Sequence, residues 1–552
     1  MELKCWGRLA DSPFVGFASQ REVENDFEQT WRVVMKSIGG LMVGSMAGML
    51  VAGGAHAADL PLKAKTVEYV RVCSLYGAGF WYIPGTDTCI KLGGYLRVDT
   101  TINGSGLQNN PAWSGDSGQG NRFRDYFTGR ARMSLTVDTR TATEYGVVRT
   151  FGGADFQFDT LGAATVNPAV LNSSFNSTLL YTPGGGYVAV EYVLIQFAGF
   201  TFGKSASAFA TPWQGYPGNN SSFLLGGHDS VTGVNNVQYT AEFGSGVTGT
   251  IGLDDPTVYN RTSIFDLATT GGLSAVGTMS SAYGGIYSPD IVGNIRVDQA
   301  WGLFQVSAAA HEVDASYNVL GAGAAPTALS EISGHPSTKW GGAVMTALQI
   351  RNIPTGPGDD FKIDASFAKG DTKNVIASSA ASPSFAIFGG SGHAYQSIAF
   401  GATTDAVYLP SASGGDGALH LTEAFGVRGA FNHNWDPYWS SALFGSASWV
   451  RNDAGAKSAY CATYIASNKL TASNTSADFS CNPNYAVYQL GLITRWTPVK
   501  NLTFSAEAMY SFLDQNFTGT ATLTPSAPMP TAVYEYKDQG TLSFNVRVQR
   551  NF

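Results

Sequence analysis

The last eleven residues, Leu542-Ser-Phe-Asn-Val-Arg-Val-Gln-Arg-Asn-Phe552, alternate in character from one position to the next. Even positions carry Leu, Phe and Val before Arg550 and Phe552, and odd positions carry Ser, Asn, Arg and Gln. Successive side chains of a β-strand point to opposite faces, so one face of this segment suits an apolar medium and the other suits water. Residues 502–512 and 361–367 repeat the pattern.

Similar segments, separated by clusters of Gly, Asn, Asp and Pro, recur from about residue 90 to the end of the chain. We count about sixteen of them, near 90–99, 127–138, 145–156, 187–197, 200–205, 235–242, 247–254, 289–299, 303–313, 339–351, 361–371, 419–434, 441–451, 485–496, 502–514 and 541–552. Short turns, such as those expected at 139–143 and 198–199, alternate with long loops. This predicts an all-β fold, a transmembrane antiparallel β-barrel of about 16 strands with long outer loops and short periplasmic turns.

The composition excludes several other classes of protein. Only 13% of the 552 residues are charged, against roughly 25% in an average soluble protein. The chain lacks the successive long apolar segments of a helical membrane protein. The net charge of -8, without a basic tract, argues against nucleic acid as a partner.

No motif predicts catalysis. The chain has no His-Glu-x-x-His, no phosphate-binding loop and no Gly-x-Ser-x-Gly elbow. Six histidines follow residue 57 and are scattered. We therefore expect no enzyme activity, no cofactor and no metal site.

The amino terminus contains one long apolar stretch, Ile38 to Ala58, which ends in Ala55-His56-Ala57. Small residues at those positions are typical of a signal-peptidase site, so residues 35–57 are predicted to be a signal peptide. The alternative is a single membrane anchor, against which the six glycines and serines within the run argue. Residues 1–34 are acidic before the apolar run and are interpreted as an upstream extension from a misassigned start.

Four cysteines follow the predicted cleavage site, in two local pairs: Cys73 with Cys89, and Cys461 with Cys481. Four cysteines allow three disulfide connectivities, and loop closure favours the local one. Zinc ligands or free thiols are the alternatives, but neither pair has a Cys-x-x-Cys or a nearby His at ligand spacing. Residues 58–89 would then form a periplasmic segment closed by the first disulfide, ahead of a barrel at 90–552.

Five stretches of the chain carry a resemblance to a known family. They are Ala58–Pro61, Val72–Phe80, Tyr82–Ile90, Thr143–Gly146 and Phe197–Gly203. Together they resemble the alphaproteobacterial porins of rhizobia and their relatives. The resemblance spans the chain after the signal peptide, is specific at its start and is diffuse in the loops.

The resemblance implies a homotrimeric general-diffusion porin, a passive water-filled channel for small hydrophilic solutes and ions. It would lie in the outer membrane of a Gram-negative bacterium, against outer-membrane lipid and lipopolysaccharide, after export by the general secretory route. Phe552 resembles the terminal signal read by the barrel assembly machinery, although it could equally belong to an aromatic girdle. A substrate-specific, sugar-type channel and a structural or adhesive barrel are the alternatives.

Arginines recur on the polar faces of the predicted strands. A charge that faces lipid at the midplane costs about 2 to 4 kcal/mol, so we expect these side chains to point inward. Four of them, with one loop acid, are predicted to line the pore constriction: Arg97, Arg130, Arg132, Arg149 and Asp229. Five more are predicted to face the lumen: Arg296, Arg351, Arg428, Arg495 and Arg547. Alternatively, the arginines only pair with inward carboxylates such as Asp99, Asp364 and Glu507.

The resemblance also implies that the third long loop, about residues 205–233, folds into the lumen. Its aromatic side chains would pack on the inner wall: Phe209, Trp213, Tyr216 and Phe223. Asp229 is its one acid, which departs from the usual acidic loop opposite a basic wall. By contrast, the loop between 379 and 417 is rich in Gly and Ser, and we expect it to be better solvated.

Overall fold

The computed structural model describes residues 71–105, 110–111, 118, 120–122, 124, 126–159, 185–213, 215–221, 223–228, 232–257, 261–377 and 383–552. The predicted upstream extension and signal peptide lie outside these residues. None of the helices in the described part of the chain is long and apolar enough to cross a membrane.

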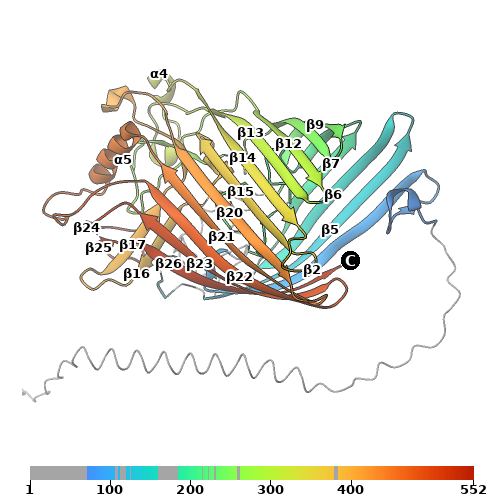
Figure 1. The fold of residues 1–552 in the computed structure, drawn as a ribbon. Coiled ribbons are helices and arrows are strands. Elements are labelled where there is room, and N and C mark those ends of the chain that lie inside the picture. The colour runs from blue at the N-terminus through green and yellow to red at the C-terminus, as the bar shows by residue number, and fades with distance from the viewer. Residues whose placement is uncertain are drawn as a thin grey trace, which may run out of the picture. The chain divides into compact units, whose positions relative to one another are not determined.

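The described residues form an antiparallel barrel in which each strand pairs with the next one along the wall (Figure 1). The barrel strands are β2 (Thr88–Ile102), β5 (Phe127–Thr143), β6 (Gly146–Asp159), β7 (Gly185–Phe197), β8 (Phe200–Ser205), β9 (Val234–Gly244), β10 (Val247–Asp254), β12 (Asp290–Gln299), β13 (Gly302–Val313), β14 (Lys339–Arg351), β15 (Asp360–Lys369), β20 (Glu423–Asn434), β21 (Trp439–Arg451), β22 (Tyr485–Val499), β23 (Leu502–Gln515) and β26 (Gln539–Asn551). Pairing of β26 with β2 closes the barrel. All sixteen segments predicted from the sequence are strands, so the predicted fold class is confirmed.

Alternation along each strand separates an apolar outer face from a polar inner face. Leu96 and Val98 on β2 point outward and are 52% and 59% exposed. The next residue, Asp99, points inward and is 1% exposed. On β26, Val546 is 54% exposed and Arg547 is 6% exposed. The outward face is the apolar band that a lipid bilayer requires.

Short turns close one end of the barrel. They lie at 144–145, 198–199, 245–246, 300–301, 352–359, 435–438 and 500–501. Gly199 has φ +84, and a Cβ there would lie 2.8 Å from the ring of Tyr239, so this turn requires glycine. The turn expected at 139–143 was wrong, because those residues continue β5.

The long loops at the other end fold into small sheets and two helices, toward the left and top of Figure 1 and away from the carboxyl terminus. One sheet contains β11 (Ser263–Asp266), β18 (Thr404–Tyr408) and β19 (His420–Leu421); another contains β16 (Phe385–Gly389), β17 (Gln396–Gly401), β25 (Ala532–Tyr536) and β24 (Thr520–Leu523). The helices are α4 (Ser330–Ser333) and α5 (Ala454–Ser467), with 3-10 turns at Ala322–Ala324, Thr372–Asn374 and Ser411–Ser413. Elsewhere, β3 (Gly104–Ser105) pairs with β4 (Asn110–Pro111), and β1 (Trp81–Tyr82) follows the 3-10 turn Ser74–Tyr76 and pairs with β2.

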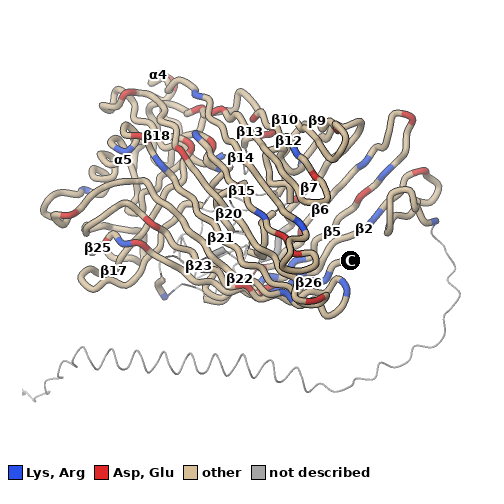
Figure 2. Tube along the Cα trace, viewed as in Figure 1, with Lys and Arg blue, Asp and Glu red and all other residues tan. Residues whose placement is uncertain are grey.

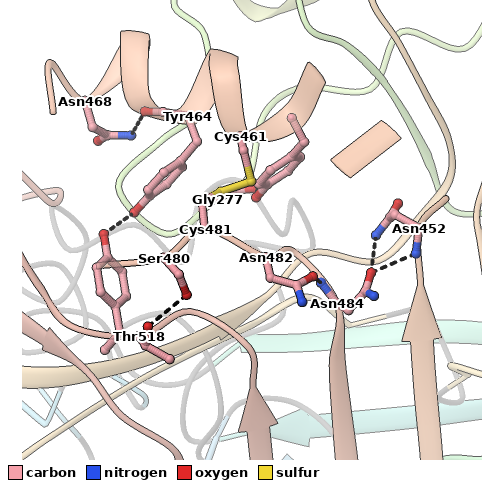
Figure 3. Close-up of a disulfide and its surroundings, with 12 residues drawn as sticks. Gly277, Asn452, Cys461, Tyr464, Asn468, Ser480, Cys481, Asn482, Asn484 and Thr518 are labelled. Atoms are coloured by element: carbon pink, nitrogen blue, oxygen red, sulfur yellow. Dashed lines mark hydrogen bonds between the residues drawn. A yellow bond between two sulfur atoms is a disulfide. The ribbon is translucent and has the colours of Figure 1, made fainter. Parts of the chain in front are cut away.

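Both predicted disulfides are present with the local connectivity, Cys73–Cys89 and Cys461–Cys481. The second joins α5 to the chain that leads into β22 (Figure 3). Beside it, the hydroxyl of Tyr464 donates to the Ala275 carbonyl at 2.8 Å. The disulfide therefore holds α5 against the core of the outer loops.

The loop between β15 and β20 contradicts the expectation that residues 379–417 are solvated. Within its described residues, Phe385 is 1% exposed, and Ala399 is fully buried. Both pack with Met345 of β14 and Leu513 of β23 in one apolar cluster. Small residues in this loop allow close packing, and its scattered Phe, Ile and Val supply the buried surface.

Candidate functional site in the barrel interior

The connection between β8 and β9 is called the inner loop; its described residues, 206–213, 215–221, 223–228 and 232–233, lie inside the barrel. Its first part contacts β12 and β13. The amide of Asn294 donates to the Ala208 carbonyl at 2.6 Å, and the amide of Gln305 donates to the Ala210 carbonyl at 2.8 Å. The two carbonyls lie outside any strand, and these inward side chains supply their hydrogen bonds. They therefore fix where the loop enters the lumen.

The middle of the inner loop is held by β22, β23 and β26. Arg495 donates to the Gly218 carbonyl, and Arg547 donates to the Asn220 carbonyl at 3.1 Å. The carboxylate of Glu507 accepts the backbone N–H groups of Asn220 and Ser221. Charged side chains of the wall therefore bind both carbonyl groups and N–H groups of this segment's backbone.

The last part of the inner loop is held by β20 and β22. The amide of Gln489 accepts from the Leu225 N–H at 2.8 Å and donates to the Phe223 carbonyl at 2.7 Å. Arg428 donates to the carbonyls of Leu224 and His228. Its Nε also lies 3.0 Å from the Asp364 carboxylate, and both side chains are fully buried.

Apolar contacts accompany these hydrogen bonds. Phe209 and Phe223 are 1% and 4% exposed, and Trp213 packs against the same cluster. Tyr216 packs beside Leu224 on a second inward cluster, and its ring centre lies 5.5 Å from the Arg428 guanidinium. The four aromatic residues thus lie in or against two inward apolar clusters, and Asp229 lies outside the described residues.

The predicted constriction arginines lie on β2, β5 and β6, and most of them are paired with acids. Arg130 lies 2.8 Å from Asp99, and Arg132 lies 2.6 Å from Asp155. The side chains of Arg130 and Arg132 are 3% and 8% exposed. This is the pairing that the alternative interpretation expected, and it removes most of their net charge.

The other arginines of this group have different partners. Arg97 donates to the Gln549 amide at 2.8 Å. Arg149 lies 3.0 Å from Asp138, which is also 3.1 Å from Arg140. Figure 2 shows basic and acidic residues interleaved along the barrel strands. The structure therefore does not gather Arg97, Arg130, Arg132 and Arg149 into one uncompensated basic cluster.

Of the five arginines predicted to face the lumen, three hold the inner loop and two form a separate group. Arg296 and Arg351 each lie 2.8 Å from Asp298. Among the described residues, no group of three or more His, Cys, Asp or Glu is placed to bind a metal ion.

Sequence reasoning missed the neutral amides that bind the inner loop, Asn294, Gln305 and Gln489. Alternation places each of them on an inward face, but an uncharged side chain carries no signal that distinguishes it from other wall residues. A search of inward Asn and Gln for donors and acceptors to the loop backbone would have found them.

The architecture defines a class of protein. A closed barrel with an apolar outer band, charged inner walls and a long loop inside is that of transmembrane β-barrels of the outer-membrane type. The model of the Porin subfamily matches residues 59–544. The chain therefore belongs to the Porin subfamily.

Relatives with known names are also porins. The chain is 32% identical over 270 residues to "Porin Omp2b" of Brucella suis and, equally, to that of Brucella abortus. This match takes in 48% of this chain and 64% of each relative. Among solved structures, the outer membrane channel DcaP of Acinetobacter baumannii is similar with a TM-score of 0.51 and 14% identity, over 85% of this chain and 99% of that one. The similarity to DcaP concerns the fold alone.

Proposed function

We propose that this protein is a passive, water-filled channel for small hydrophilic solutes and ions across the outer membrane. The observation that carries the proposal is the inner loop, which is anchored across one side of the barrel by wall side chains. A barrel of about sixteen strands encloses a bore wider than a small solute, so size selection needs an inserted element.

The contacts of the inner loop indicate where solutes would pass. Within the described part of the chain, the side-chain hydrogen bonds between residues 208–228 and the barrel wall come from β12, β13, β20, β22, β23 and β26. We infer that the polar faces of β2 and β5 to β9 border the open part of the lumen. We place the solute path along these strands, where Arg97, Arg130, Arg132 and Arg149, together with the carboxylates that pair with the last three, would set the local field.

Membership of the Porin subfamily and the apolar outer band support an outer-membrane location, a channel rather than an enzyme, and contact with outer-membrane lipid and lipopolysaccharide. Export by the general secretory route, insertion by the barrel assembly machinery through Phe552 and assembly as a homotrimer complete the proposal. Chemical cross-linking of the purified protein, followed by mass determination, tests the trimer.

Reconstitution into planar bilayers, with a solute-size series in liposomes, tests the channel itself. We expect ohmic conductance in KCl and swelling rates that fall smoothly with solute size. Saturable flux of one sugar class would favour the substrate-specific alternative. Absence of conductance would contradict the proposal and favour a structural or adhesive barrel.

A further inference from the structure

A pocket of about 510 Å³ opens at the turn end of the barrel, against β5 to β9. Its lining includes the β7–β8 turn at Ala198 and Gly199, which places it at the periplasmic mouth of the proposed path. The volume lies within the range of roughly 300 to 1,000 Å³ that is typical of small-molecule sites.

One side of the pocket carries excess positive charge. Arg140 of β5 and Arg149 of β6 both line it. They share one carboxylate, that of Asp138, at 3.1 and 3.0 Å, and each arginine side chain is 30% exposed. Two positive charges against one negative charge leave one positive charge uncompensated, with guanidinium groups that solvent can reach.

The other side carries an unpaired acid. Glu242 of β9 lines the pocket and is exposed. Within the described part of the chain, no hydrogen bond or ion pair of its carboxylate is found. Because β9 lies four strands from β5 along the wall, this negative charge is well separated from Asp138.

Uncharged polar groups lie between the two charged sides. Gln196 of β7 accepts from Arg149 at 2.8 Å and donates to the Thr201 hydroxyl of β8 at 3.0 Å. Thr240 of β9 continues the lining toward Glu242. This row of amide and hydroxyl groups can bind the peptide or hydroxyl groups of a ligand that extends from one side to the other.

An aromatic residue borders the pocket from the amino-terminal segment. Tyr76 lines the pocket, and its ring centre lies 5.7 Å from the Arg140 guanidinium, which is also 4.9 Å from the Phe80 ring. Both rings belong to the segment that the Cys73–Cys89 disulfide closes. The disulfide therefore fixes a wall of the pocket as well as the segment itself.

We propose that this pocket is a binding subsite for small zwitterions of about dipeptide size, with the carboxylate at Arg140 and Arg149 and the ammonium group at Glu242. The inference rests on the proposed channel function, since it names a solute class that would pass the same mouth. Adjacent strands are about 4.8 Å apart, so β6 and β9 are separated by roughly 14 Å along the wall, part of which the long arginine and glutamate side chains span. A dipeptide, with its charges at opposite ends, fits the remaining distance better than a single amino acid.

Calorimetric titration of the purified full chain tests the subsite with three probes that share one dipeptide core. Alanyl-alanine carries both charges, its N-acetyl derivative only the negative one, and its amide only the positive one. We expect alanyl-alanine to bind about tenfold more tightly than either derivative, as one added charge-assisted hydrogen bond allows. Glu242→Gln should abolish this advantage over the N-acetyl derivative, whereas Glu144→Gln, at the exposed β5–β6 turn outside the pocket, should preserve it.

Equal affinity for the three probes, or equal effects of the two substitutions, would overturn the subsite. KCl conductance of the same preparation separates this failure from that of the channel. Conductance without zwitterion preference overturns the subsite alone, and zwitterion preference without conductance overturns the channel alone.

Discussion

Two walls of one barrel are built by the same alternation and are filled in different ways. On β2 and β5, inward arginines are neutralised by inward acids, as Arg130 is by Asp99. On β14, β22 and β23, the outer-loop half of the inward face carries Met345, Val487 and Leu513, which pack against loop side chains. We call the first the charged wall and the second the apolar wall.

This difference teaches that alternation identifies the inward face but not the medium that the face contacts. An inward position is wet only where no loop covers it. On the apolar wall the inner loop and the β15–β20 loop supply the cover, so inward residues resemble those of an ordinary protein core. The predictions below test the two walls separately.

The largest effect is expected from Arg428→Ala on β20, which lies between β14 and β22 of the apolar wall. Removal of the guanidinium leaves the Asp364 carboxylate buried without its charge partner and frees two inner-loop carbonyls. The cost of breaking such a buried pair is about 3 to 5 kcal/mol. We expect release of the inner loop, a larger single-channel conductance and a lower melting temperature.

The double variant Arg428→Met with Asp364→Leu is the matched control, because it removes both charges together. It should recover most of the stability that the single variant loses. If the single variant keeps the native conductance and melting temperature, the anchoring role assigned to Arg428 is wrong.

The next largest effect is expected from Phe385→Ala in the β15–β20 loop. Its side chain is 1% exposed and its ring lies 5.7 Å from that of Tyr485, so truncation leaves a cavity that costs about 3 kcal/mol. Thermal unfolding measures the loss. Phe367→Ala, on the lipid-facing side of β15 and 42% exposed, should cost much less. Equal costs would show that this loop is as solvated as its Gly and Ser content suggests.

Much of the fold could be predicted because strand alternation is a local signal. All sixteen barrel strands and both disulfides followed from it and from cysteine spacing. The packing of residues 385–401 could not, because it depends on contacts with strands far away in the chain. The same reason applies to the candidate site: alternation predicts that the arginines point inward, but which of them meet acids and which meet the loop backbone depends on strand register and on the path of the loop.

A smaller effect is expected when Cys461 and Cys481 are both replaced by serine. The cross-link spans 20 positions, so its loss should cost the outer loops about 2 kcal/mol by freeing the unfolded chain. The barrel should remain closed, since no barrel strand depends on the bond. Protease sensitivity of α5 should rise, while conductance stays unchanged. Loss of the barrel itself would contradict the prediction that the disulfide stabilises only the outer loops.

On the charged wall, Arg132→Gln should change ion preference. The substitution leaves Asp155 without its partner at 2.6 Å and adds one net negative charge to the proposed path. A fixed charge beside a narrow water column is poorly screened, and an effect of about 1 kcal/mol corresponds to roughly a fivefold change in permeability ratio. Reversal potentials in a salt gradient should shift toward cations. The double variant Arg132→Gln with Asp155→Asn should restore the original value, and an unmoved potential in the single variant would place the path elsewhere.

The smallest effect concerns the turn between β14 and β15, where Asp359 directly precedes β15. Desolvation alone would raise the pKa of Asp359, but hydrogen bonds from the backbone N–H of Asn434, from Thr355 and from His433 lower it to about 2. Because this pKa is lowered in the folded state, the Asp359 carboxylate stabilises the fold fully at pH values above its unfolded-state pKa, near 3.9. This stabilisation is lost as the pH falls through about 2. Asp359→Asn should therefore lower the melting temperature slightly at pH 7, and this difference should vanish toward pH 2.

Asp478→Asn, at an exposed position in the β21–β22 loop, is the control and should leave the melting temperature unchanged at every pH. A constant difference between wild type and Asp359→Asn from pH 7 to 2 would show that the carboxylate acts through shape rather than charge. Ionisation would then matter where acids pair with arginines, as Asp99 does with Arg130 and Asp364 does with Arg428, rather than at this turn.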